Sequence, residues 1–201
     1  MKSHRIVVFG DSITKGFDDS QGGWVHRLKR DLENRENSDY SIYNCGISGN
    51  NTRDLLKRLK TENEARFLEE NDEHIVVFAI GTNDSSKYHE NNKYHVPLEE
   101  FKENMNDLIH QAQELSTRII IIGLTSIDEN KTTPVSWDSN LSYYQKNVEA
   151  YNSALLDIAQ DHNLEFVKLL NTVPLDDMED GLHPNDKGHE KIYQKIKKLF
   201  N

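Results

Sequence analysis

The stretch Ile6-Val7-Val8-Phe9-Gly10-Asp11-Ser12 decides the fold of this 201-residue chain. Four consecutive apolar residues ended by a glycine are typical of a strand that is covered on both faces of a parallel sheet. The serine follows the strand directly, so its hydroxyl is predicted to lie at the carboxyl edge of that sheet. Open α/β folds bind their ligands at this edge.

Further strands and helices alternate along the rest of the chain. Short apolar runs cover residues 6–9, 40–44, 75–80, 119–122 and 164–167. Segments with a helical period of apolar residues cover 24–32, 53–68, 101–112, 148–159 and 186–200. This fivefold alternation predicts one α/β domain over residues 1–201, with a parallel sheet and right-handed crossovers. Two long loops, 84–97 and 125–140, follow apolar strands and are predicted at the carboxyl edge.

Composition and charge restrict the partners and the cellular site. A formal net charge of −10 argues against nucleic acid and anionic lipid as main partners. The apolar run 75–80 is too short to span a bilayer, so no stable membrane insertion is expected. Cys45 is the only cysteine, which excludes an internal disulfide and a zinc site built from thiolates. The four apolar residues before Gly10 are too few for a secretory signal. A cytoplasmic location is predicted, unless a signal has been removed.

Four polar segments are expected to meet at one edge of the sheet. Three of them, residues 10–12, 46–50 and 81–84, follow strands, and the fourth, 180–185, leads into the last helical segment. A serine becomes nucleophilic when a base takes its proton and a third group orients that base. Asp180 lies three residues before His183, so its carboxylate can meet Nδ1–H and leave Nε2 for Ser12. Acyl transfer is the leading interpretation of this pattern.

Each of these residues also has a plainer interpretation when taken alone. Ser12 is a good helix cap, and Asn83 suits an Asx turn. Gly49 suits a tight turn. Asp180 belongs to an acidic run and His183 to a loop, where neither needs a special role. The functional interpretation rests on the four segments occurring together, in positions that bring them to one edge.

Together these segments resemble the GDSL-type esterases and lipases, also called the SGNH hydrolases, and among them the small lysophospholipase-like or acyl-esterase members. The resemblance covers the whole chain, with Ile13 where the family name has leucine. Its blocks are Gly10-Asp11-Ser12-Ile13, Asn44-Cys45-Gly46-Ile47-Ser48-Gly49, Gly81-Thr82-Asn83-Asp84 and Asp180-Gly181-Leu182-His183-Pro184-Asn185. The resemblance implies a three-layer, flavodoxin-like fold with a five-stranded parallel sheet. The strained G-x-S-x-G elbow of α/β-hydrolases has no counterpart around Ser12.

The resemblance also implies roles for individual residues. Ser12 would be the nucleophile, His183 the general base and Asp180 its orienting carboxylate. The oxyanion hole would consist of the backbone N–H groups of Ser12 and Gly49 and the side-chain amide of Asn83. These roles imply a serine esterase that cleaves small acyl esters through an acyl-enzyme, with a small-molecule ester as partner and with no cofactor and no metal.

Other functions stay open beside this one. The chain can be a catalytically silent binding module of the same fold, or an esterase specialised for acetylated carbohydrate. A metal-dependent phosphoesterase is disfavoured, because no second His or Asp follows Asp11 at ligand spacing. Trp137, Tyr143 and Tyr144 border a long loop and suit either a pocket wall or the core. Acyl length, alcohol and oligomeric state are not determined by the sequence, and a homo-oligomer is compatible with it.

Overall fold

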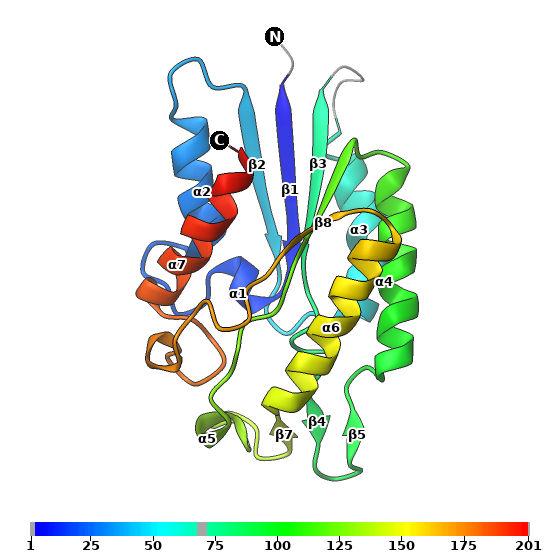
Figure 1. Cartoon of the computed structure of the whole chain (residues 1–201), viewed down its shortest axis with the longest axis vertical. Helices are drawn as coiled ribbons and strands as arrows, with labels where there is room; N and C mark the ends of the chain where they lie inside the picture. The colour runs from blue at the N-terminus through cyan, green and yellow to red at the C-terminus, as the bar shows by residue number, and fades with distance from the viewer. Residues whose placement is uncertain (1–2, 68–71, 201) are drawn as a thin grey trace.

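A computed structural model describes residues 3–67 and 72–200, and its centre is a five-stranded parallel sheet (Figure 1). The strands are β1 (His4–Gly10), β2 (Tyr40–Gly46), β3 (Glu73–Ala79), β6 (Arg118–Ile122) and β8 (Glu165–Val167). Their order across the sheet is β2-β1-β3-β6-β8. The predicted α/β fold with a five-stranded parallel sheet is therefore confirmed, and each predicted apolar run lies in or beside one of these strands.

Helices cover both faces of the sheet and complete the three layers. On one face lie α2 (Gly23–Glu33), α7 (Asp186–Ile196) and the short 3-10 helix η2 (Lys197–Phe200). On the other face lie α3 (Thr52–Glu64), α4 (Leu98–Gln113) and α6 (Gln145–Asp161). Figure 1 shows the pair α2 and α7 beside each other, across the sheet from α3, α4 and α6.

The first strand shows why its sequence is apolar without alternation. Residues Ile6 to Phe9 have no exposed surface. Ile6 and Val8 face the core under α2 and α7, whereas Val7 and Phe9 face the core under the other three helices. A strand with helices over both faces needs an apolar side chain at every position. β1 is thus an inner strand of the sheet, paired with β2 on one side and β3 on the other.

The connections of the sheet create a crevice at the ends of two strands. The chain leaves β1 toward β2 on one side, and it leaves β3 toward β6 on the other. Neighbouring strands whose connections diverge form the switch point at which such sheets bind ligands. The switch point here lies between β1 and β3. Ser12 follows the first of these strands and Asn83 follows the second.

The two segments predicted as long loops, together with the residues directly after the second, carry short elements of their own. Three two-residue strands, β4 (Lys87–Tyr88), β5 (Lys93–Tyr94) and β7 (Leu141–Ser142), form a small antiparallel sheet in the order β5-β4-β7. The helix α5 (Glu129–Thr132) lies within the second segment. All four elements lie at the lower end in Figure 1, toward which the main strands run. Strands this short leave no recognisable alternation in a sequence.

Two predicted helices have different ends in the structure. The helix expected over 53–68 ends at Glu64, and Leu68 lies outside the described residues. The helix expected over 186–200 changes from α7 into η2 at Lys197. Shifts of this size at helix ends are common, because terminal turns tighten or fray. No described helix combines the length and the apolar character needed to cross a membrane.

Candidate active site

The serine at the end of β1 opens a short helix, α1 (Ser12–Lys15). The Asp11 carboxylate caps this helix by accepting a hydrogen bond from the Ile13 N–H at 2.9 Å. As the first helical residue, Ser12 has a backbone N–H with no acceptor inside the helix. Gly10 permits this tight passage, since a Cβ there would collide with Thr14 and with the carbonyl oxygen of Ala79.

Burial gives the capping carboxylate an unusual affinity for protons. Asp11 is buried, which raises its pKa to about 6, and the hydrogen bond from Ile13 opposes that shift. Asp11 is nonetheless directed into the turn of α1 as its cap. The geometry therefore assigns Asp11 a structural role: it caps α1 beside Ser12.

His183 approaches Ser12 from the segment that connects the 3-10 helix η1 (Leu175–Asp177) to α7. Its Nε2 lies 2.8 Å from Ser12 Oγ, and its Nδ1 lies 2.6 Å from Asp180 Oδ2. An ionised carboxylate only accepts hydrogen bonds, so Nδ1 carries the proton and Nε2 faces the hydroxyl as an acceptor. Ser12 at one end of the sequence and the Asp180–His183 pair near the other form one chain of hydrogen bonds.

The Asp180 carboxylate is held by its own loop. Its Oδ1 accepts the backbone N–H groups of Leu182 at 2.9 Å and of His183 at 2.8 Å. Burial acts to raise its pKa, but the hydrogen bonds from the His183 side chain and backbone outweigh it, so the net pKa is lowered. Asp180 is therefore ionised at neutral pH. The plainer interpretation of Asp180 as one of a solvated acidic run does not describe these contacts.

The side chain of Asn83 is oriented by two partners. The Tyr143 hydroxyl donates to Asn83 Oδ1 at 2.7 Å, and Asn83 Nδ2 donates to the carbonyl oxygen of Asn50 at 2.9 Å. Burial raises the pKa of Tyr143 far above the neutral range, so its hydroxyl keeps the proton that it donates. With one amide N–H committed to Asn50, the other is left for a ligand in the crevice.

Gly49 completes the group of predicted site residues. Its φ of 80° is a left-handed conformation that strains other residues. A Cβ at this position would meet no atom within 4 Å, so its side faces open space. Ser12, Gly49, Asn83, Asp180 and His183 all line one cavity of about 360 Å³. The structure thus brings together every residue for which the sequence predicted a site role.

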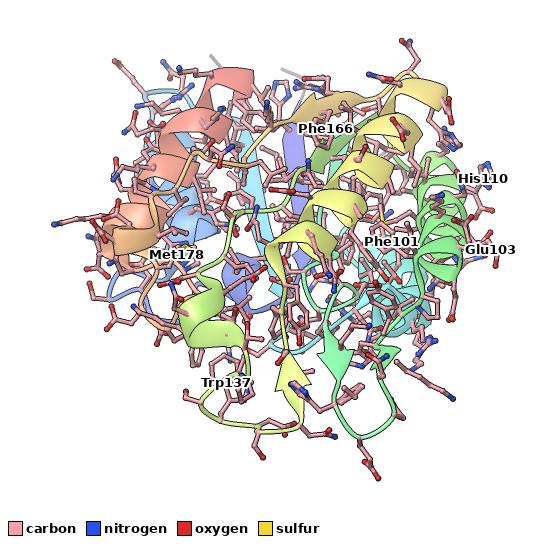
Figure 2. All side chains as sticks on the ribbon, turned by 60° about the horizontal axis from the view of Figure 1, so that its bottom comes forward. Phe101, Glu103, His110, Trp137, Phe166 and Met178 are labelled. Carbon is pink, nitrogen blue, oxygen red and sulfur yellow. The ribbon has the colours of Figure 1, made fainter. Side chains whose placement is uncertain are left out.

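The walls of this cavity come partly from the two long segments. His95 comes from the first, Trp137 from the second, and Leu141 and Tyr143 follow the second. Figure 2 places Trp137 beyond α5, at the end of the molecule that carries the small sheet. The sequence left Tyr144 open between a pocket wall and the core. Tyr144 lines a different groove, together with Lys87 and Tyr88.

Several residues at the site were not expected there from the sequence. Phe17 lines the cavity with its ring centroid 4.7 Å from that of His183. His95 also lines it, and burial together with the nearby Arg53 lowers its pKa. The signal for Phe17 was weak: it is a lone aromatic residue between Gly16 and Asp18. His189 is buried and structural, and it accepts the Trp24 N–H on Nδ1.

Three side chains near Ser12 offer oxygen and nitrogen atoms that could act as ligands of a cation. Atoms of Asp18, Asp180 and His183 lie within 4.8 Å of one another. Both ring nitrogens of His183 already take part in hydrogen bonds with Ser12 and Asp180. A cation at this place would compete with the chain of hydrogen bonds rather than support it.

Comparison with known proteins agrees with the geometry. The model of the GDSL-like Lipase/Acylhydrolase family matches residues 8–191. The isoamyl acetate-hydrolyzing esterase 1 homolog of Bos taurus is 30% identical, over 96% of this chain and 79% of its own. The isoamyl acetate-hydrolyzing esterase of Saccharomyces cerevisiae is 26% identical, over 100% of this chain and 87% of its own.

A solved structure extends the agreement to the fold. The lipase/acylhydrolase from Enterococcus faecalis superposes with a TM-score of 0.76 at 25% identity, covering 100% of this chain and 95% of that one. The family match includes the segments that carry Ser12, Asn83 and His183. The chain belongs to the GDSL-like lipase/acylhydrolase family and is a carboxylic ester hydrolase.

Proposed function

We propose that the protein is a serine esterase that cleaves small carboxylic esters through an acyl-enzyme, with Ser12, His183 and Asp180 as its triad. The observation that carries the proposal is the continuous chain of hydrogen bonds from Ser12 Oγ through both nitrogens of His183 to Asp180. It is the arrangement in which a base removes the serine proton and a carboxylate stabilises the resulting imidazolium.

The reaction begins at the serine hydroxyl. Ser12 Oγ attacks the ester carbonyl carbon while His183 Nε2 takes its proton. The carbonyl oxygen becomes an oxyanion, which accepts hydrogen bonds from the backbone N–H groups of Ser12 and Gly49 and from the free amide N–H of Asn83. The carbon–oxygen bond to the alcohol then breaks, and the alcohol oxygen takes the proton from Nε2. Water repeats these steps on the acyl-enzyme and releases the acid.

Removal of the Asn83 amide is expected to slow the chemical step. Asn83→Ala should lower kcat by roughly 10²–10³-fold and change KM little, because an oxyanion donor acts mainly in the transition state. Steady-state kinetics on an acetyl ester measures both constants. Asn104→Ala is the matched control, since that buried amide donates to Thr52 away from the cavity. A raised KM with kcat intact would instead make Asn83 a contact of the ground state.

A preference for short acyl groups is part of the proposal. The cavity of about 360 Å³ lies near the lower end of small-molecule sites and has to hold the whole ester. Two relatives carry names that refer to hydrolysis of an acetate ester, which also favours a short acyl group.

A series of esters that share one alcohol tests the proposed function. We expect kcat/KM to be largest for acetyl, propionyl or butyryl esters and to fall at octanoyl. A maximum at octanoyl or beyond would contradict the short-acyl preference. Absence of hydrolysis across the whole series would favour the alternative of a silent binding module, which the intact chain of hydrogen bonds disfavours.

A further inference from the structure

Two exposed aromatic side chains lie close to the candidate base, His183. The rings of Phe17 and Trp137 have centroids 4.7 Å and 5.7 Å from that of His183. Their exposed fractions are 46% and 50%, although most large apolar side chains of the described chain are buried. Single exposed apolar residues are ordinary, but two that line the same cavity mark a binding surface.

Local hydrogen bonds hold the backbone that carries both rings. The Phe17 N–H donates to the carbonyl oxygen of Ser12 at 3.0 Å, and the Phe17 carbonyl oxygen lies 3.3 Å from His189 Nε2. The turn that carries Trp137 is closed where the Leu141 N–H donates to the carbonyl oxygen of Asp138 at 3.1 Å. The backbone beneath the two walls is therefore formed before a ligand binds, which lowers the entropic cost of binding.

The chemistry of the proposed function determines which part of the ester meets these rings. When the tetrahedral intermediate collapses, the alcohol oxygen takes the proton from His183 Nε2, so this oxygen lies beside the imidazole. The oxyanion lies on the other side, toward Gly49 and Asn83. The first carbons of the alcohol thus begin next to the His183 ring and extend along the rings of Phe17 and Trp137.

The charges at this side of the cavity favour a neutral alcohol. Oxygen atoms of Asp18 and Asp180 lie within 4.8 Å of each other and of a His183 nitrogen. The whole chain carries a formal net charge of −10. A phosphate or carboxylate on the alcohol would be repelled by these carboxylates at short range. Aromatic walls and negative charge together favour an apolar, uncharged group.

We infer that Phe17 and Trp137 form the subsite for the leaving alcohol, and that this subsite takes neutral apolar alcohols. The inference rests on the proposed function, since it uses the proton transfer from His183 to locate the alcohol. It assigns to the two exposed rings a selectivity that the triad and the oxyanion donors do not provide.

Esters that share the acetyl group and differ in the alcohol test this subsite. Benzyl acetate and methyl acetate release alcohols of similar acidity, so the ratio of their kcat/KM values reports mainly on contacts of the alcohol. Trp137→Ala is expected to lower this ratio about tenfold, the effect typical of an apolar contact in a pocket. Phe17→Ala should change it in the same direction, and Trp137→Phe should restore most of it. Leu175→Ala removes an equally exposed side chain elsewhere and should leave the ratio unchanged.

A second measurement tests how the subsite binds an alcohol independently of the acylation step. When p-nitrophenyl acetate forms the acetyl-enzyme in the presence of benzyl alcohol, that alcohol and water compete for the acetyl group. The wild type should form benzyl acetate in clear excess over the Trp137→Ala variant at equal turnover, because the alcohol attacks from the same subsite that it leaves. A variant that merely lost structure would lose both products together, so the product ratio separates the two effects.

The outcomes distinguish this inference from the proposed function. Hydrolysis of acetates with an unchanged benzyl-to-methyl ratio in Trp137→Ala would overturn the subsite and leave the esterase intact. Preference of the wild type for an acetylated methyl glycoside or for 1-acetyl-glycerol 3-phosphate over benzyl acetate would also overturn it, in favour of a sugar or an anionic alcohol. Failure of the wild type to hydrolyse any ester would overturn the proposed function and the subsite with it.

Discussion

Replacing Ser12 with alanine is expected to lower kcat by roughly 10⁴–10⁶-fold, the largest effect of any single substitution in this protein. The substitution removes the atom that forms the acyl bond, whereas the oxyanion donors and the cavity remain. Its hydroxyl makes the 2.8 Å contact with His183, so the fold loses one hydrogen bond and little packing. Hydrolysis of an acetyl ester by the purified variant measures the loss.

Covalent labelling provides the second readout for Ser12. A fluorophosphonate should add one phosphonyl group to the wild type, located at Ser12 by mass spectrometry, and none to Ser12→Ala. The control Ser153→Ala changes an exposed serine on α6 and should keep both labelling and activity. Labelling at another residue, or full activity of the Ser12 variant with an unchanged thermal midpoint, would reject the assignment of the nucleophile.

Replacing Asp180 with asparagine is expected to lower kcat by about 10⁴-fold. The backbone N–H groups of Leu182 and His183 hold one oxygen of the side chain, so the new amide NH₂ would take the place of the other oxygen, beside His183 Nδ1. The imidazole would then carry its proton on Nε2 and could no longer accept the proton of Ser12. The geometry would survive while the wrong nitrogen faces the hydroxyl.

The control for this substitution is a carboxylate of the same acidic run. Asp176 is exposed on η1, and Asp176→Asn should keep most of the maximal rate. Steady-state kinetics on one acetyl ester compares the three proteins, and circular dichroism verifies that each is folded. Equal losses from the two variants would mean that the triad carboxylate has been misassigned.

The fold was predictable because its strands are unusually uniform. The runs 6–9, 75–80 and 119–122 are continuous in apolar residues, and only a sheet covered on both faces requires that. The site residues could be predicted for a related reason: Ser12 and Asn83 follow two of these strands directly. Parallel strands bring such positions to one edge whatever the intervening helices are.

The cavity walls and the orientation of Asn83 could not be predicted from the sequence, because they depend on very short strands and on contacts between residues that are far apart in the chain. The strands β4, β5 and β7 are too short for a pattern, although their segments bring His95 and Trp137 to the cavity. The hydrogen bond from Tyr143 to Asn83 joins residues sixty positions apart and needs the folded small sheet beside α6.

The order in which the site is made along the chain has a consequence for its biosynthesis. Ser12 and His183 are 171 positions apart, so a ribosome that adds roughly 5–20 residues per second completes the base about 9–34 s after the nucleophile. Until then the serine is an ordinary alcohol, and the α2 face of the sheet lacks the cover of α7. A nascent chain that lacks His183 is therefore inert toward esters, and the first appearance of hydrolysis would time the docking of α7.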